Sequence, residues 1–273
     1  MLADLWKRLR TDSPRWAQRL GLTREHFAIA TRHARVRAAW APHLRASREA
    51  ILAAADRCAR RERALVIGAG DCLDVPVTEL AERFAQVTLA DIVVSATAKD
   101  FAKRFSGRMR CEQWDATGAL ARLSEVRDVI SAHDAPRLFA EADPGPPPGG
   151  EPDFVVSANC LSQLGLVPGH SLPAAEKDKA LPERCAKVAA RRHLDWLAER
   201  RGAVRVLLVD AARLDLAPDG VTVRKTETLY TRFGLRAPDR TWRWNLAPIP
   251  EWSPDFHRVH DVGAWIDEPA GSS

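Results

Sequence analysis

The middle of the chain alternates between short apolar runs and longer stretches in which apolar residues recur every three or four positions. Continuous apolar runs bounded by turn residues are typical of buried strands, and the longer period is typical of helices. Strands are predicted at 64–70, 86–92, 109–115, 153–164 and 203–214, and helices at 75–85, 97–107 and 183–201. Such an alternation predicts an α/β, Rossmann-like fold, in which helices cover both faces of a mostly parallel sheet.

The two ends of the chain have a different pattern. Residues 1–60 predict helices only, and we expect them to form a helical N-terminal cap on a Rossmann-like domain at 61–273. Thr23 is a candidate N-cap, and Pro42 is expected to break or kink a helix, with a further amphipathic turn beginning at Ser47. Beyond residue 220, two further strands are predicted at 221–230 and 241–250, as antiparallel additions at an edge of the sheet.

Two segments interrupt the alternation of strands and helices. Residues 142–152 are dominated by Pro and Gly and predict a loop before the fourth strand. Residues 165–183 follow that strand and are too long for an ordinary connection. Long loops at the carboxyl ends of strands are where α/β proteins often bind substrate.

Glycines and polar residues follow the predicted strands at the edge where open parallel sheets bind ligands. Gly68 and Gly70 allow a tight turn after the first strand, so that backbone N–H groups can approach a ligand closely. Asp91 ends the second strand, 21 residues after Gly70, where a carboxylate can bind ribose hydroxyls. Similar positions belong to Asp115 in the third strand and to Ser157 and Asn159 in the fourth.

The turn after the first strand argues against a dinucleotide. A G-x-G-x-x-G fingerprint that starts at Gly68 needs a third glycine at position 73, which is Leu. Asp71 and Asp74 place negative charge where a pyrophosphate would lie, although phosphates bind backbone N–H groups and not carboxylates. A cofactor with a ribose, no phosphate and a cationic or amino-acid end suits this turn better.

The order of a GAG turn, two strands ending in Asp91 and Asp115, and a fourth strand reading DFVVSAN resembles the class I S-adenosylmethionine-dependent methyltransferases over about residues 60–215. The resemblance implies S-adenosylmethionine as the cofactor, with Gly68 and Gly70 at its methionine portion, Asp91 at the ribose, and Asp115 with Ala116 at the adenine. The neighbouring Ala69, Ile92 and Ser157 complete the cofactor site that it implies.

Two departures from the family's first motif concern the methionine end. Val66 stands where the family usually has an acid in the first strand, and Cys72 replaces the usual third glycine. We hypothesise that Asp71 or Asp74 supplies the missing carboxylate.

Methyl transfer from a sulfonium is an in-line displacement, so holding donor and acceptor in line can supply much of the catalysis. A base is needed only where the acceptor must lose a proton. The candidate catalytic residues are Asn159, for positioning the acceptor, His170 in the long loop, and Tyr230. The acceptor itself is not identified, and a small molecule is favoured.

Composition and cysteine usage argue against a membrane-spanning or secreted protein. An apolar fraction of 46% is ordinary for a globular protein, and no window approaches the roughly 18 uncharged apolar residues of a membrane span. The start predicts no signal peptide, and five scattered cysteines without a CxxC pair favour a reducing compartment and no zinc site, so a cytoplasmic protein is expected.

Residues 1–63 contain fifteen Lys or Arg against six Asp or Glu, which is typical either of a solvated helix face or of a nucleic-acid footprint. Trp242, Trp244 and Trp252 lie beside arginines, where they would either stack on bases or, as we favour, pack against the protein. RNA as the methyl acceptor, a cofactor-binding protein without catalysis, and an NAD-dependent oxidoreductase therefore remain as alternatives.

Overall fold

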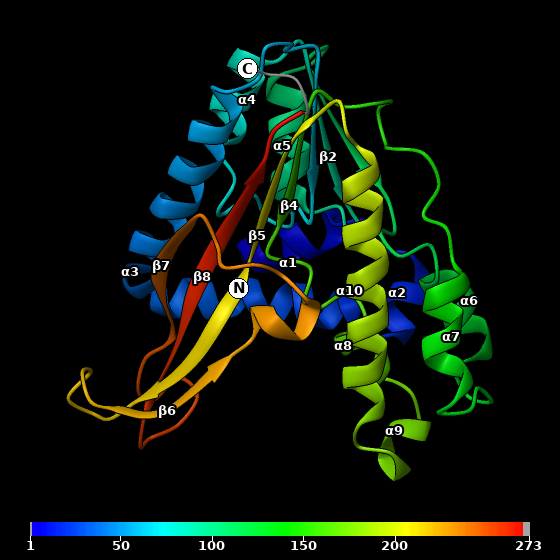
Figure 1. The fold of residues 1–273 in the computed structure, drawn as a ribbon, viewed down its shortest axis with the longest axis vertical. Coiled ribbons are helices and arrows are strands. Elements are labelled where there is room, and N and C mark those ends of the chain that lie inside the picture. Colours follow the sequence, from blue (N-terminus) through cyan, green and yellow to red (C-terminus); the bar gives the residue numbers. More distant parts are fainter. Residues whose placement is uncertain (1, 270–273) are drawn as a thin grey trace.

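Five parallel strands form the main part of the sheet, in the order β3-β2-β1-β4-β5 (Figure 1). The structure is a computed structural model and describes residues 2–269. The strands are β1 (Arg63–Ile67), β2 (Gln86–Asp91), β3 (Met109–Gln113), β4 (Phe154–Ala158) and β5 (Val204–Leu216). Each lies within a segment predicted as a strand or overlaps it closely, and the predicted mostly parallel, Rossmann-like sheet is confirmed.

Three antiparallel pairings extend the sheet beyond β5. β8 (His257–Asp267) pairs with β5, and β7 (Arg240–Ala247) pairs with β8 at the edge. β6 (Val223–Thr228) pairs with the second half of β5. The predicted late strands are therefore confirmed as β6 and β7. The sequence reading missed β8, although this strand lies between β5 and the predicted edge strand.

Helices cover both faces of the sheet. Those predicted at 75–85, 97–107 and 183–201 are confirmed as α4 (Val77–Arg83), α5 (Ala96–Arg104) and α10 (Leu181–Glu199). Four short helices were not predicted, and two of them lie in the segment expected to be a long loop. They are α6 (Leu120–Val126), α7 (Asp134–Glu141), α8 (Leu166–His170) and α9 (Ala174–Lys177). A 3-10 turn at Tyr230–Phe233 follows β6.

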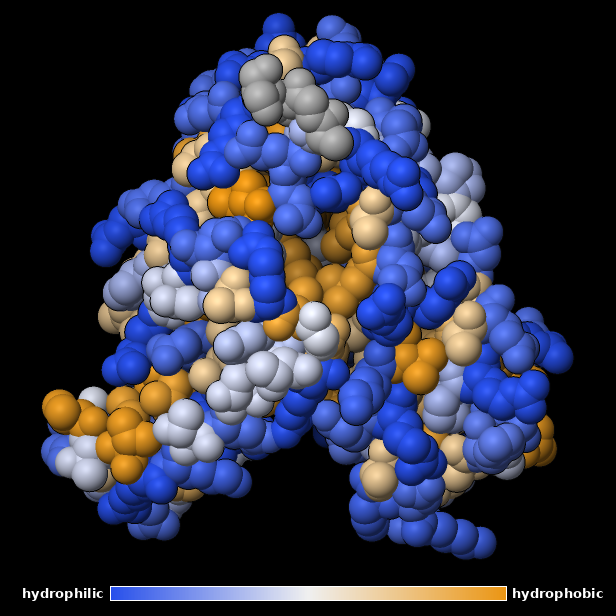
Figure 2. All heavy atoms as spheres, viewed as in Figure 1, coloured by the Kyte–Doolittle hydropathy of each residue, from blue (hydrophilic) through white to orange (hydrophobic). Residues whose placement is uncertain are grey.

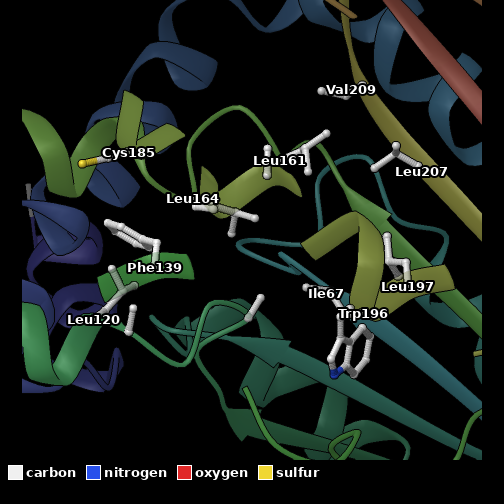
Figure 3. Close-up of a cluster of buried hydrophobic side chains, with 14 of the residues drawn as sticks. Ile67, Leu120, Phe139, Leu161, Leu164, Cys185, Trp196, Leu197, Leu207 and Val209 are labelled. Carbon is white, nitrogen blue, oxygen red and sulfur yellow. The ribbon is translucent and has the colours of Figure 1, made fainter. Parts of the chain in front are cut away.

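Alternate residues of each central strand face opposite layers of helices, as the period of two in a strand requires. In β1, Leu65 and Ile67 belong to the core beneath α10, α6 and α7, whereas Ala64 and Val66 belong to the core beneath α3, α4 and α5. Both cores are apolar and fully buried. Figure 3 shows the first core, where Leu161, Leu164 and Trp196 lie around Ile67.

The N-terminal helices are α1 (Leu2–Arg10), α2 (Arg15–Arg19) and α3 (Leu22–Ala55). The helical character predicted for residues 1–60 is confirmed. In Figure 1 the first half of α3 crosses the molecule and the second half rises along one side towards α4. The helix contacts α4, β5 and β7. The N-terminal segment therefore packs directly on the sheet domain.

Local expectations about α3 were wrong in three places. Its N-cap is Gly21 in the left-handed conformation (φ 80°), and Thr23 instead lies inside the helix, with its hydroxyl 2.5 Å from that of Ser13. The helix continues through Pro42 and departs from helical geometry at Val36 (φ −116°, ψ 30°). A proline ring clashes with the carbonyl four residues earlier, which here belongs to residue 38, so the departure at Val36 is not a break at Pro42 itself. Ser47 does not begin a new helix.

The order of the strands reverses at β1, which pairs with β2 on one side and β4 on the other. Ligands of open α/β sheets bind beyond the carboxyl ends of the strands at such a point. Ile67 and Ser157 are paired in register, so the Gly68–Gly70 turn and the end of β4 lie at the same edge. This edge is where the candidate site is found.

Hydrophilic residues cover most of the face shown in Figure 2, and apolar residues gather in its centre and over the β6 hairpin. At this hairpin, Val221 is 78% exposed and Val223 is 50% exposed. In the described part of the chain, no helix has the length and apolar character needed to cross a membrane.

Candidate functional site

The turn after β1 depends on glycine at position 68. Gly68 has φ +75°, and a Cβ atom there would lie 2.9 Å from the carbonyl oxygen of Ala158 and 2.9 Å from Cβ of Cys160. The backbone of the turn therefore lies directly against the end of β4. Gly70 also has positive φ (+49°), but a Cβ atom there would meet no heavy atom within 4 Å.

Asp91 holds this turn in place. Its Oδ2 accepts a hydrogen bond from the Gly70 N–H (2.8 Å), and its Oδ1 accepts one from the Val93 N–H (3.1 Å). Burial raises the pKa of the Asp91 carboxyl, whereas these backbone N–H groups act in the opposite direction. A carboxylate oxygen can accept more than one hydrogen bond, so the Asp91 side chain keeps acceptor capacity for a ligand hydroxyl.

A cavity of about 230 Å³ opens at this edge of the sheet. Its floor is the turn after β1, the ends of β2 and β4 and the middle of β5, and α3 forms the opposite wall. The sequence-predicted residues that line it are Gly68, Ala69, Gly70, Asp71, Asp74, Asp91, Ile92, Ala116 and Asn159. The structure therefore brings nine of the thirteen candidates together around one space.

The lining of the cavity is acidic. Five carboxylates line it, and among the described lining residues there is no Lys or Arg. They are Glu25, Asp71, Asp74, Asp91 and Asp210. A pyrophosphate would lie among uncompensated negative charges, whereas a cationic ligand would be attracted. The charge of the lining thus disfavours a dinucleotide.

Asp74 and Asn159 connect the turn after β1 with the end of β4. The Asn159 side-chain N–H donates to Asp74 Oδ2 (2.5 Å), and Asn159 itself has positive φ (51°). The Asn159 Oδ1 atom is buried and has no hydrogen-bond partner. Asp71 Oδ1 lies 4.0 Å from Nε2 of His26, on α3. A carboxylate at each of these two positions faces the cavity near Gly70.

The end of the cavity beneath β7 is aromatic. Trp40 and His43 come from α3 and Trp244 from β7, and all three line the space. Burial lowers the pKa of His43 to about 4. Because the Trp242 indole N–H donates to His43 Nδ1 (3.0 Å), a neutral His43 carries its own proton on Nε2.

Two predicted cofactor residues do not line the cavity. The Asp115 carboxylate accepts hydrogen bonds from the N–H groups of Thr117 and Leu120, both at 2.8 Å, and so orders the start of α6. Ser157 is fully buried, and its hydroxyl lies 2.9 Å from Nε2 of the buried His193. Only their neighbours Trp114, Ala116, Ala158 and Asn159 reach the space.

Two predicted catalytic residues also lie away from the cavity. His170 ends α8 and is exposed to solvent. Tyr230 lies in the 3-10 turn after β6, and its ring packs against Trp265 at a centroid distance of 6.0 Å. The structure therefore brings only Asn159 of the three catalytic candidates to the site.

Several lining residues were missed by sequence reasoning. Those from α3 are Leu22, Glu25, His26, Ile29, Ala30, Trp40, His43 and Leu44, and the others include Trp114, Cys160, Asp210 and Trp244. Asp210 carries a signal that could have been used, since it is a lone acid inside the apolar run of β5. Burial raises the pKa of the Cys160 thiol to about 12, which keeps the thiol protonated near pH 7. No three His, Cys, Asp or Glu residues between positions 2 and 269 form a group that could hold a metal ion.

No family model and no curated protein matches the sequence. Solved structures are similar in fold over most of the chain, and the three described below are methyltransferases by name. One is the 1,6-didemethyltoxoflavin-N1-methyltransferase of Burkholderia thailandensis, with 1,6-didemethyltoxoflavin and S-adenosylhomocysteine bound. It is 16% identical, with 89% of this chain and 90% of that chain covered and a TM-score of 0.37.

An O-methyltransferase family protein from Burkholderia thailandensis is 12% identical, with 84% of this chain and 57% of that chain covered and a TM-score of 0.34. The 23S rRNA methyltransferase ErmE is 15% identical, with 81% of this chain and 69% of that chain covered and a TM-score of 0.31. Because these identities and TM-scores are low, support for a function must come from the residues of the site.

Proposed function

We propose that the chain is an S-adenosylmethionine-dependent methyltransferase. The observation that carries this proposal is the acidic cavity at the point where strand order reverses, with five carboxylates and no Lys or Arg among its described lining residues. A ligand with a ribose and a cationic amino-acid end fits this set of donors and acceptors. A ligand with phosphates does not.

Each part of the cavity suits one part of this cofactor. The Gly68–Gly70 turn offers backbone close to a ligand, and Asp91 has acceptor capacity for ribose hydroxyls. Ile92, Trp114 and Ala116 form an apolar wall suited to an adenine ring. Asp71 and Asp74 lie beside the turn and would bind the ammonium group of the methionine end.

When bound, the cofactor supplies a methyl group on a sulfonium, which is a strong electrophile. The task of the chain is then to hold an acceptor in line with that group and to exclude water. Asn159 is placed for this, because it lines the cavity with its amide fixed by Asp74. α3 closes the space from the opposite side.

The alternatives receive less support. An NAD-dependent oxidoreductase would have to place a pyrophosphate among the carboxylates of the cavity. An RNA acceptor rested on the basic N-terminal segment, but many of its arginines pair with acids of the same chain. These pairs are Arg10–Asp100, Arg19–Asp128, Arg35–Glu251, Arg57–Glu268 and Arg60–Asp153. A small-molecule acceptor is therefore part of the proposal.

Isothermal titration with S-adenosylhomocysteine, and with NAD as the competing ligand, tests the proposal. We expect S-adenosylhomocysteine to bind with a Kd of about 100 μM or tighter, and NAD not to bind. Asp91→Asn should weaken binding by about tenfold, since it removes a charged acceptor. Glu125→Gln, on the exposed side of α6, is the matched control. Absence of S-adenosylhomocysteine binding to the unmodified protein at about 1 mM overturns the proposal.

The same titration separates the two acids proposed for the methionine end. If Asp71→Asn or Asp74→Asn weakens binding by about tenfold, that carboxylate is the ammonium partner. If neither change weakens binding, the hypothesis for these acids is wrong. Transfer of a labelled methyl group to any small molecule in a lysate distinguishes an enzyme from a cofactor-binding protein without catalysis.

A further inference from the structure

The end of the cavity beneath β7 has aromatic walls. The rings of Trp40 and Trp244 meet edge to face, with centroids 4.9 Å apart. His43 stacks on Trp244 with centroids 4.2 Å apart and planes inclined by 10°. Three rings from α3 and β7 therefore enclose one part of the ligand space.

A carboxylate from β5 reaches the same place. Asp210 lines the cavity, and its Oδ1 lies 3.0 Å from Nδ1 of His260, on β8. The His260 ring is in turn 6.1 Å from Trp244, which connects Asp210 with the aromatic walls. The Asp210 Oδ1 atom is buried and has no aligned hydrogen-bond partner. The Asp210 side chain is 19% exposed. Because Oδ1 is buried, Oδ2 is the oxygen that a ligand can reach.

Among the described residues that line the cavity, no Lys or Arg offsets the carboxylates at this end. His43 faces Asp74 and Asp210, but burial lowers its pKa to about 4, so the ring is neutral near pH 7. Asp74 is bound by the amide of Asn159, which carries no charge. His260 is the ion-pair partner that the described residues give Asp210. The Trp244 indole N–H is buried without a partner.

We propose that this end of the cavity binds the methyl acceptor, and that the acceptor is an organic amine bound as its ammonium ion. The inference rests on the proposed function and adds the chemical class of the substrate. An ammonium group gains a charge-assisted hydrogen bond to Asp210 Oδ2 at the part of the cavity that Trp244 also lines. A carboxylate or phosphate acceptor would be repelled by Asp74 and Asp210.

Asp210 also has a role in preparing such an acceptor. An ammonium ion has no lone pair, so its nitrogen must lose one proton before it can accept a methyl group. The N–H bond breaks, its electron pair stays on the nitrogen, and Asp210 Oδ2 takes the proton. His260 Nδ1 lies 3.0 Å from the other oxygen of the same carboxylate.

The test measures binding to the full chain saturated with S-adenosylhomocysteine. Three probes of matched shape are titrated calorimetrically: 2-phenylethylamine, 2-phenylethanol and phenylacetate. We expect the amine to bind about tenfold more tightly than the alcohol, and the acid not to bind. Asp210→Asn should remove the preference for the amine and leave the affinities for the alcohol and for S-adenosylhomocysteine within about twofold.

Asp128→Asn, in the exposed turn after α6, is the matched control and should keep the preference. Equal affinity for the amine and the alcohol, no amine binding at about 10 mM, or an unchanged preference in Asp210→Asn each overturn the inference. If Asp210→Asn does not fold, the affinities of the amine, the alcohol and the acid for the unmodified protein still test the inference. Failure of S-adenosylhomocysteine to bind overturns the proposed function instead, so the two failures are distinguishable.

Discussion

Gly68 and Gly70 lie in the same turn and have similar backbone conformations, but different surroundings. Both have positive φ, a region that a side chain makes costly. Only Gly68 lies so close to the end of β4 that a Cβ atom would meet Ala158 and Cys160 at 2.9 Å. Alanine variants of the two glycines therefore separate two losses of folding free energy. One comes from the positive φ angle, and the other comes from the close contact with β4.

We predict that Gly68→Ala lowers the free energy of unfolding by about 3 kcal/mol and Gly70→Ala by about 1 kcal/mol. The first change strains the backbone and separates β1 from β4, whereas the second only strains the backbone. Urea denaturation of both variants measures the difference. Equal losses in the two variants would show that the contact with β4 contributes nothing.

At the residue scale, the sequence predicted which positions lie at the edge of the sheet better than it predicted what their side chains do. Position follows from the end of an apolar run, as for Asp91 and Asp115. Orientation depends on local hydrogen bonds, and the Asp115 carboxylate turns into its own loop to bind the N–H groups that begin α6. Only a structure shows that Asp91 reaches the cavity and Asp115 does not.

At the scale of the elements, α3 is the part of the site that the sequence could not place. Its helical character is evident, but nothing in the pattern indicates that its side chains meet the carboxyl edge of the sheet. β8 was missed for a different reason. Its first half carries His257, Arg258 and His260, and only the second half is continuously buried. Pairing with β5 gives this polar segment its strand structure.

α3 is tied to the ligand-binding edge by Arg48, whose Nη2 donates to the carbonyl oxygen of Leu73 at 2.5 Å. We predict that Arg48→Met loosens the loop that carries Asp71 and Asp74. Hydrogen exchange of the amides at 71–75 should become about tenfold faster, which corresponds to about 1.4 kcal/mol of local opening.

The control for this measurement is Arg45→Met, three residues earlier on α3, where the side chain is exposed. It should leave exchange at 71–75 unchanged. Equal rates in the two variants would mean that the Arg48 contact does not restrain the loop.

At the scale of the whole molecule, two buried histidines connect stability with pH. Burial lowers the pKa of both His43 and His193 to about 4. An unfolded histidine has a pKa of about 6.5, so between pH 6.5 and 4 the unfolded chain binds more protons than the folded chain. Stability from each histidine is therefore complete above about pH 6.5 and is lost as the pH falls toward 4.

We predict that His193→Gln reduces the slope of unfolding free energy against pH by up to about 1.4 kcal/mol per pH unit within this window. Glutamine can still hydrogen-bond to Ser157 but does not titrate. Comparison with the unmodified protein removes the contribution of carboxyl groups such as Asp91 and Asp115, whose pKa values are raised by burial. Chemical denaturation at pH 4.5, 5.5 and 6.5 measures the slopes. An unchanged slope would show that the pKa of His193 is the same in the folded and unfolded states.

The place of β8 has a consequence for how the protein is made. Residues 257–267 lie between β5 and β7 in the sheet, although they come after both along the chain. A nascent chain that has reached residue 250 has its parallel strands but no partner for the long side of β5. The facing edges of β5 and β7 then remain unpaired on the ribosome, and β8 pairs with both when it emerges. A premature stop before residue 257 would thus leave a sheet able to pair with other chains.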